Sequence, residues 1–242
     1  MPKPIVVVPA RLAATRLPGK PLADIGGQPM IVHVWQRATA AAIGPVLVAT
    51  DSAEIAAVVT EAGGVAILTA PDHPSGSDRV FAALEAFDPG RRHDIVINLQ
   101  GDLPLIEPAL IAAAILPLHE PAADLATLAA PLRDEAERHN PDVVKVGGPA
   151  LPSGHLMAQI FCREPVGGFP LYHHIGVYAY RRAALERFVA LPPSPRERRD
   201  RLEQLRALDN GMRIDVALVE APVFGVDTPA DLERARALLR QR

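Results

Sequence analysis

The feature that most constrains the fold is an alternation of short apolar runs with segments of helical character. The apolar runs occupy residues 5–8, 46–49, 65–68 and 95–99. Continuous apolar runs of this length are typical of strands buried on both faces of a parallel sheet. Strands that alternate with helices indicate βαβ units. We therefore predict the α/β class with a three-layer architecture and a mostly parallel central sheet.

The chain has 242 residues, of which 49% are hydrophobic, enough for one sizeable core. Since no Ser/Gly-rich linker or charge block divides it, we predict one domain over residues 1–242. Further strands are expected at 125–132, 143–146, 157–161 and 175–180, and a helix at 182–189. The Gly/Pro-rich region 147–170 is expected to form loops.

Three cations follow the first strand within a proline-rich loop. Arg11, Arg16 and Lys20 lie at the carboxyl end of residues 5–8, where open α/β sheets bind ligands. Guanidinium groups suit phosphate oxygens, and the prolines and Gly19 restrict the loop to few conformations. The pattern favours a phosphate-rich ligand, and the alternative is a solvated basic loop.

Two well-known phosphate loops do not fit this segment. No G-x-G-x-x-G motif follows the strand, and Lys20 is followed by Pro21 where a Walker loop has Ser or Thr. Ala14 also stands where such a loop has its first glycine.

Two aspartates carry the second signal. Asp102 follows the apolar run 95–99 in the turn Gln100-Gly101-Asp102, and Asp227 precedes Thr228-Pro229. Magnesium prefers oxygen ligands and is commonly held by one or two carboxylates together with substrate phosphates. Taken alone, Asp102 could equally be a turn former.

Other polar residues have structural interpretations. Asp51 with Glu54 is predicted to form a capping box that opens a helix, and Thr228 with Asp231 to open the last helix. Trp35 lies at helical spacing with apolar neighbours and is expected in the core.

Composition excludes several classes of partner. The net charge of -3 is unfavourable for nucleic acid or an anionic membrane surface. A single cysteine, Cys162, cannot form an internal disulfide or a cysteine zinc cluster. No segment has the length of a membrane span or the apolar core of a signal peptide. We therefore expect a cytoplasmic protein.

The loop PARLAATRLPGKP, residues 9–21, resembles the nucleotide-binding loop P-A-R-x-x-S-T-R-L-P-G-K-P of the sugar-acid cytidylyltransferases. The chain is most similar to the 3-deoxy-manno-octulosonate cytidylyltransferase (CMP-Kdo synthetase) family. The resemblance implies a Rossmann-like fold of the nucleotide-diphospho-sugar transferase type. It implies that the nucleotide is bound by Pro9, Ala10, Arg11, Arg16, Lys20 and Gln100, with catalytic roles for Lys20, Arg11, Asp102 and Asp227. The two aspartates would share a magnesium ion, and a second ion would accompany the triphosphate.

Four further motifs match the family's contacts to the sugar acid. They are DHPSGSDR (72–79), FCREP (161–165), HHIGVY (173–178) and LEQLR (202–206). The resemblance implies that the sugar acid is bound by Arg79, Gln100, Arg163, His174, Tyr178, Glu203 and Gln204. Arg79 could otherwise be a helix-surface residue after a Ser75/Asp78 cap. His173 and His174 could otherwise be zinc ligands, but neighbouring strand residues point to opposite faces.

The family's N-P-N-x-V-K-V strand is matched by residues 140–146, where Lys145 is interpreted as an edge-strand charge and left out of the site. The sequence departs from the family at three places. Ala14 replaces a serine, so that Thr15 would have to supply the hydroxyl contact. Leu103 stands where many members have glutamate, and the segment after Arg163 is shortened.

The function implied is transfer of CMP from CTP to 3-deoxy-D-manno-octulosonate (Kdo), which gives CMP-Kdo and pyrophosphate for lipopolysaccharide biosynthesis. CTP, Kdo and Mg²⁺ are the expected small-molecule partners. The alternatives are a related enzyme for amino-Kdo, a neuraminic-type acid or a sugar phosphate, and a non-catalytic nucleotide-binding module. The family is typically dimeric, so we expect a homodimer with sugar-acid contacts and a dimerisation region at about 125–210.

Overall fold

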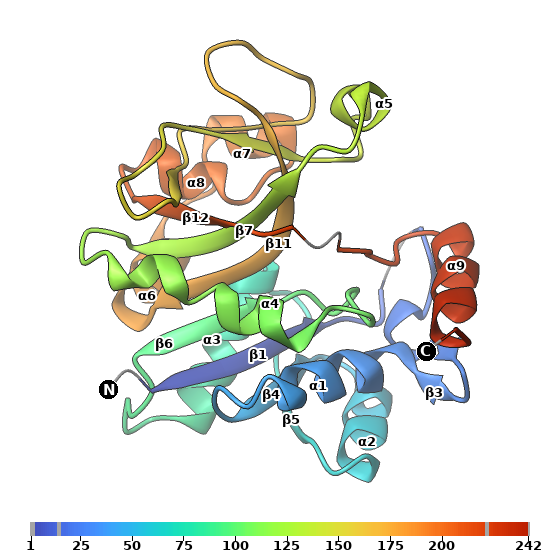
Figure 1. Ribbon diagram of the computed structural model, residues 1–242. Coiled ribbons are helices and arrows are strands. Elements are labelled where there is room, and N and C mark those ends of the chain that lie inside the picture. The colour runs from blue at the N-terminus through green and yellow to red at the C-terminus, as the bar shows by residue number, and fades with distance from the viewer. Residues whose placement is uncertain (1–2, 14–15, 221–222, 242) are drawn as a thin grey trace. The chain divides into compact units, whose positions relative to one another are not determined.

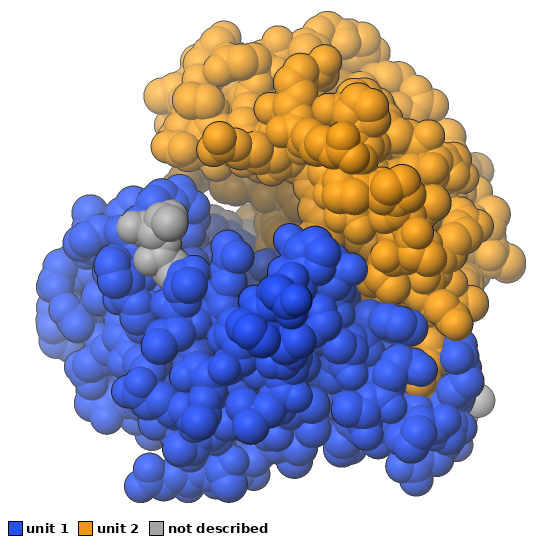
Figure 2. All heavy atoms as spheres, turned by 180° about the vertical axis from the view of Figure 1, so that it is seen from behind, with its two compact units in different colours: residues 1–112, 223–242 blue, residues 113–222 orange. Residues whose placement is uncertain are grey.

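The computed structural model describes residues 3–13, 16–220 and 223–241, and divides the chain into two compact units (Figures 1 and 2). Unit 1 comprises residues 1–112 and 223–242, and unit 2 comprises residues 113–222. The region expected to bind the sugar acid, 125–210, lies entirely in unit 2. The single domain expected from the sequence stays a prediction.

Unit 1 is built around parallel strands in the order β5-β4-β1-β6. Their bounds are β1 (Pro4–Ala10), β4 (Val46–Thr50), β5 (Val65–Leu68) and β6 (Ile95–Leu99). All four coincide with the predicted apolar runs. β1 lies inside this sheet, and residues 5–8 of β1 and 96–97 of β6 are completely buried. Parallel strands in this position need apolar side chains on both faces.

Helices cover both faces of this sheet (Figure 1). α1 (Met30–Ala40) and α2 (Ala53–Glu61) pack on one face, and α3 (Gly76–Phe87) packs against β1, β4 and β5 on the other. α9 (Pro229–Leu239) contacts the short hairpin of β2 (Asp24–Ile25) and β3 (Gln28–Pro29). The predicted α/β class with layered helices is confirmed.

Unit 2 has a mixed sheet in which β11-β7-β12-β9 follow one another and β8 pairs with β10 and β11. Only β7 and β12 are parallel among these pairs. The strands are β7 (Leu125–Pro131), β8 (Lys145–Gly147), β9 (Leu156–Met157), β10 (Ile160–Cys162), β11 (Tyr172–Arg181) and β12 (Ile214–Leu218). The single strand expected at 157–161 is therefore two short strands.

The helices of unit 2 are short. They are η2 (Leu116–His119), α5 (Glu135–His139), α6 (Arg182–Ala190), α7 (Pro195–Asp200) and α8 (Leu205–Asp209). α4 (Pro108–Ala113) leads from unit 1 into unit 2. None of the helices in the described ranges is long and apolar enough to cross a bilayer.

The helix caps test three predictions. Thr228 and Asp231 form the predicted capping box of α9, and Ser75 caps α3 through the backbone N–H of Asp78. The box predicted for Asp51 and Glu54 is wrong, because Ser52 caps α2 by accepting from the backbone N–H of Ile55. The Asp51 carboxylate is instead held by a buried arginine, described below.

Candidate active site

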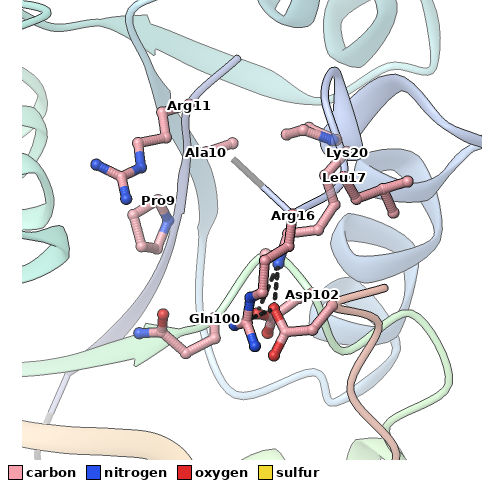
Figure 3. A pocket seen from close by; sticks show the side chains of 11 residues that line it. Pro9, Ala10, Arg11, Arg16, Leu17, Lys20, Gln100 and Asp102 are labelled. Atoms are coloured by element: carbon pink, nitrogen blue, oxygen red, sulfur yellow. Dashed lines mark hydrogen bonds and ion pairs between the residues drawn. The ribbon is translucent and has the colours of Figure 1, made fainter. Parts of the chain in front are cut away.

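A polar pocket lies in unit 1 at the carboxyl ends of β1 and β6 (Figure 3). It is lined by Pro9, Ala10, Arg11, Arg16, Leu17, Lys20, Pro21, Gln100, Gly101, Asp102 and Asp227. Every residue that the resemblance assigns to the nucleotide or to the metal is among them. Parallel sheets gather ligand-binding groups at this end, because the loops after neighbouring strands meet there.

Asp102 reaches the pocket through a tight turn after β6. A Cβ atom at Gly101 would lie 2.9 Å from the carbonyl oxygen of Pro9, closer than side chains normally approach. Only glycine therefore allows the turn to pass so close to β1. The carboxylate of Asp102 is thereby placed directly after the strand.

Asp227 also lines the pocket, although it belongs to the carboxyl-terminal segment of unit 1, residues 223–242. The backbone N–H of Val226 donates to the carbonyl oxygen of Asp102 at 2.9 Å. The backbone N–H groups of Asp227 and Thr228 donate to Asp231, at 3.2 and 2.9 Å. Asp231 thus fixes the backbone and leaves the Asp227 carboxylate for the pocket.

A small apolar core packs against the loops that carry Lys20, Asp102 and Asp227. Ile25, Met30, Leu105, Val226 and Leu232 are buried in one cluster. The cluster packs together the segment after the cationic loop, the segment after Asp102 and the start of α9. The backbone that carries the polar groups of the pocket is therefore held by apolar contacts. Leu103, the departure from the family pattern, is only 6% exposed and has an apolar role.

Lys20 lies between the two aspartates. Its Nζ atom is 3.0 Å from Oδ2 of Asp102 and 3.1 Å from Oδ1 of Asp227. Gly19, with φ of 67°, occupies the left-handed region and turns the chain into η1 (Lys20–Leu22), which carries the lysine. Burial alone would lower the pKa of Lys20, but the two carboxylates outweigh it and raise the pKa above its ordinary value. The amine is charged at neutral pH.

The two arginines of the loop are placed differently. Nη2 of Arg16 lies 3.1 Å from Oδ1 of Asp227, and its side chain is 60% exposed. Arg11 is exposed, makes no ion pair with any described residue, and points away from Asp102 in Figure 3. Gln100 donates to Asn98 at 3.1 Å. The guanidinium groups of Arg11 and Arg16 are both open to a ligand.

The prediction that Thr15 supplies the hydroxyl contact in place of Ala14 falls outside the described residues.

The carboxylates of Asp102 and Asp227 fit a divalent cation. They converge on one positive charge, the Lys20 amine, and therefore already surround a cation-sized position with oxygen atoms. Magnesium commonly uses one or two protein carboxylates and completes its shell with water and phosphate. Within the described ranges no larger group of His, Cys, Asp and Glu converges in this way.

Arg79 is buried in unit 1, away from the residues that line the pocket. Its guanidinium lies 2.9 Å from Oδ2 of Asp51 and donates to Oγ1 of Thr69 at 2.6 Å, and its side chain is 4% exposed. The alternative of a helix-surface residue is wrong, because Arg79 is buried in an ion pair with Asp51. The contact with the sugar acid stays a prediction.

The remaining sugar-acid candidates lie in unit 2, where an aromatic cluster contains two of them. The ring of His174 is 5.1 Å from that of Phe161 and 5.4 Å from that of Tyr178, measured between centroids. Burial and the nearby His173 lower the pKa of His174 to about 3, so the imidazole is neutral. Burial, Tyr180 and the Glu203 carboxylate hold the pKa of Tyr178 well above its ordinary value, so its hydroxyl stays protonated.

His173 and His174 point to opposite faces, as strand geometry requires. His173 hydrogen-bonds Glu137 at 2.7 Å, whereas Nε2 of His174 lies 3.0 Å from Oγ1 of Thr127. Burial alone would raise the pKa of Glu137, but hydrogen bonds from Arg133 and His173 outweigh it and lower the pKa to about 2. The two imidazoles therefore have separate partners.

Glu203 and Gln204 come immediately before α8, and Gln204 is 7% exposed. The Glu203 carboxylate lies close enough to Tyr178 to contribute to the raised pKa of its hydroxyl. The structure thus brings His174, Tyr178 and Glu203 into one neighbourhood within unit 2.

Arg163 is tied to two loops. Nε donates to the carbonyl oxygen of Asp200 at 3.2 Å, and Nη1 to that of Pro141 at 3.0 Å. The side chain is partly exposed, so further donors of its guanidinium face solvent. Its contact with the sugar acid stays a prediction.

Lys145 was underestimated by the sequence pattern. Its side chain is fully buried, and Nζ donates at 2.6 Å to the carbonyl oxygens of Asn140 and Arg163. The interpretation as an edge-strand charge is wrong. Burial lowers the pKa of this amine, yet two carbonyl acceptors hold it in place, so Lys145 fixes the backbone that carries Arg163.

The α/β fold, the cationic loop and the paired aspartates are the features expected of an enzyme that binds a nucleotide and transfers a phosphate-containing group. Comparison with known proteins specifies it further. The profile of the cytidylyltransferase family matches residues 5–214. The 3-deoxy-manno-octulosonate cytidylyltransferase of Methylobacterium radiotolerans is 62% identical over 100% of this chain and 99% of its own.

Solved structures agree with this result. The structure of CMP:2-keto-3-deoxy-manno-octonic acid synthetase complexed with CTP superposes with a TM-score of 0.88, at 40% identity, over 99% of both chains. A cytidylyltransferase from Leptospira borgpetersenii, 14% identical, covers 100% of this chain and 88% of its own with a TM-score of 0.66, and shares the fold. The chain belongs to the cytidylyltransferase family, among the 3-deoxy-manno-octulosonate cytidylyltransferases.

Proposed function

We propose that the protein transfers a cytidylyl group from CTP to Kdo and releases pyrophosphate. The observation that carries the proposal is the convergence of Asp102, Asp227 and Lys20, with Arg16 beside them, in one pocket of a chain so similar to enzymes of this name. The bond between the α- and β-phosphates breaks, and a new bond forms between the α-phosphorus and a hydroxyl oxygen of the sugar acid. The hydroxyl proton leaves to solvent. No protein nucleophile is needed.

On the nucleotide side, the cations of the loop bind the triphosphate. Arg11 and Arg16 are exposed and able to meet phosphate oxygens with paired donors, and Lys20 supplies a compact charge. Together they offset the charge that grows on the departing pyrophosphate. Pro9, Ala10 and Gln100 line the same pocket and complete the nucleotide contacts.

Magnesium belongs to the proposal as a group held by Asp102 and Asp227. When bound, it supplies a Lewis acid that lowers the pKa of an attacking hydroxyl and neutralises phosphate charge. Lys20 occupies the place between the carboxylates, so a metal ion and the lysine amine compete for the same oxygens. A triphosphate attracts the amine and thereby frees the carboxylates. A second ion would accompany the triphosphate.

Unit 2 supplies neutral contacts to the sugar acid. His174 is uncharged, Tyr178 keeps its proton and Gln204 is an amide. Such groups form directional hydrogen bonds with hydroxyls and discriminate against analogues that leave them unpaired. Glu203 adds an acceptor, and Arg79, Arg163 and Gln100 complete the proposed set.

A cytidylyltransferase for a related 2-keto sugar acid is the second candidate within the same class. The names of the relatives favour Kdo over amino-Kdo and neuraminic-type acids. The intact pair Asp102 and Asp227 is unfavourable for a non-catalytic module.

Pyrophosphate release tests the proposal. Purified protein is given CTP with Kdo, amino-Kdo or N-acetylneuraminate, with and without Mg²⁺, and UTP replaces CTP in parallel. We expect turnover with CTP, Kdo and Mg²⁺ together, and little with the other acids. If turnover is faster with another acid, that acid and not Kdo is the substrate. Absence of turnover with every acid would support the alternative of a non-catalytic nucleotide-binding module.

The cytoplasmic location, the role in lipopolysaccharide biosynthesis and the homodimer complete the proposal. A molar mass of twice 25.8 kDa by light scattering would support the dimer. The monomer mass would contradict it.

A further inference from the structure

The buried threonine below the aromatic cluster has no role in the function described so far. Thr127 lies on β7, is completely buried, and places its hydroxyl among three groups of β11. Oγ1 is 3.0 Å from Nε2 of His174, 3.1 Å from the carbonyl oxygen of Ile175 and 2.8 Å from that of Val177. A hydroxyl with three polar neighbours in a dry environment indicates a fixed hydrogen-bond arrangement.

The three groups surround an irregularity in the sheet. His174 pairs with Ala129 and Ile175 with Leu128, but the next pair on β11 is Tyr178 with Thr127. Gly176 and Val177 therefore have no opposite residue in the register with β7 and form a bulge. Such bulges redirect side chains and are common beside functional sites.

The bulge explains how His174 and Tyr178 meet. In a regular strand, residues four positions apart are separated by roughly 13 Å. Here the two residues lie opposite Ala129 and Thr127, which are neighbours on one face of β7. Their rings are 5.4 Å apart, and the Thr127 hydroxyl lies within hydrogen-bond distance of the carbonyl oxygens of Ile175 and Val177.

Proton counting settles the direction of the hydrogen bonds. The Thr127 hydroxyl has one hydrogen, and both carbonyl oxygens can only accept. That hydrogen therefore goes to Val177, at the shorter distance, or to Ile175. The threonine oxygen is then the acceptor for His174, so Nε2 of the neutral imidazole carries the proton and Nδ1 carries the lone pair.

Nδ1 of His174 is available to a ligand. Across the parts of the chain that the structure describes, it has no hydrogen-bond partner. It also differs from the unpartnered ring nitrogens of His73 and His155, which are sealed from solvent. The pKa of His174, about 3, keeps the ring neutral at any pH near 7.

We propose that Thr127 is a positioning residue that fixes His174 as its Nε2–H tautomer and holds the bulge that sets His174 beside Tyr178. His174 then presents Nδ1 as an acceptor for a hydroxyl of the ligand. An acceptor that cannot rotate away favours a polyhydroxylated acid with a hydroxyl at this point over an analogue without it. The ligand assignment rests on the proposed function, whereas the tautomer follows from contacts within unit 2.

Thr127→Val tests the proposal because it keeps the shape and removes the hydroxyl. We expect the KM for Kdo to rise about three- to tenfold, the effect of one neutral hydrogen bond, with the KM for CTP unchanged. Thr127→Ser restores the hydroxyl and should recover most of the affinity. Thr60→Val, at a threonine whose hydroxyl donates only to its own helix backbone, is the matched control.

The ring tautomer gives a readout independent of activity. Nitrogen-15 spectra of the imidazoles, with His174 assigned by loss of its signals in His174→Gln, should show a protonated Nε2 and an unprotonated Nδ1 in the wild type. Thr127→Val should shift the two signals toward a mixture of tautomers, while Thr127→Ser should not. An Nδ1–H tautomer in the wild type, or unchanged signals together with an unchanged KM in Thr127→Val, overturns the proposal. Absence of turnover with correct nitrogen signals would instead refute the function and leave the tautomer intact.

Discussion

The pocket of unit 1 and the aromatic cluster of unit 2 offer a ligand opposite kinds of side chains. In unit 1, charged groups stand on loops and remain partly exposed, with the side chains of Arg16 and Asp227 60% and 42% accessible. In unit 2, His174 and Gln204 are buried and neutral. Charge attracts a polyanion over distance but discriminates little, whereas fixed neutral groups discriminate at contact. We therefore expect the choice of sugar acid to depend mainly on unit 2 and the rate on unit 1.

The largest effect is expected where the comparison is sharpest, at the two carboxylates of unit 1. Asp102→Asn or Asp227→Asn should lower kcat on the order of a thousandfold, because a charge that holds the metal is lost. Steady-state kinetics over a magnesium titration measures the effect, and circular dichroism checks the fold. Asp24→Asn, at an exposed carboxylate of the same unit, is the control. Near-normal turnover of either variant at limiting magnesium would remove the aspartates from the mechanism.

Arg79 is a test of whether unit 1 also contributes to the sugar acid. Arg79→Ala leaves the largely buried Asp51 carboxylate, 15% accessible, without its partner and should reduce the free energy of unfolding by about 3 kcal/mol. Chemical denaturation measures this change. The double variant Arg79→Met with Asp51→Leu should recover most of the stability, since no charge remains uncompensated. If the KM for Kdo stays raised in the stable double variant, Arg79 also contacts the sugar acid. A normal KM would limit it to structure.

Arg16→Ala should act on the nucleotide alone. Loss of one charge-assisted contact is worth roughly 1.5–3 kcal/mol, so the KM for CTP should rise about tenfold or more. The KM for Kdo should change little, and the effect should weaken as salt is raised. An equal change in both KM values would show that the two units are not separate in their substrate contacts.

The smallest effect concerns pH and a carboxylate of unit 2. The pKa of Glu137 is lowered to about 2 by Arg133 and His173, so its ion contributes stability above its ordinary pKa near 4.5. That contribution is lost as the pH falls from about 4.5 to about 2, and is on the order of 1 kcal/mol because Arg133 is largely exposed. Comparison of Glu137→Gln with the wild type by denaturation across this window should show the difference disappearing in acid. A constant difference down to pH 2 would contradict the linkage.

The strands of unit 1 were predictable because each is a continuous apolar run. β1, β4 and β6 are largely buried, whereas β5 lies at the edge of the sheet with Val65 and Leu68 exposed. Asp102 and Asp227 were found through turn and cap signals that lie within a few residues of each. The contacts between distant residues were not predictable in this way. The assignment of Asp51 to a helix cap failed because the sequence does not reveal that Arg79, 28 positions later, takes its carboxylate.

Unit 2 was harder to predict, for a physical reason. Lys145 resembles any strand lysine until its two carbonyl acceptors, on different loops, are seen. Thr127 has significance only through the bulge of β11, which arises from pairing across some 50 residues. Local pattern describes what one segment prefers, whereas these residues depend on the register between segments.

The pocket of unit 1 is formed by two stretches of sequence, one before and one after the residues of unit 2. Its β1, β4, β5 and β6 precede residue 113, but Asp227 and α9 follow residue 222. During synthesis the ribosome therefore makes all of unit 2 after the cationic loop and before the second carboxylate. Because domains fold from the amino terminus as they are made, the nascent chain has a phosphate loop long before it can complete the carboxylate pair. The carboxylate pair is therefore completed last, when the segment that begins at Val223 is made and packs beside Asp102.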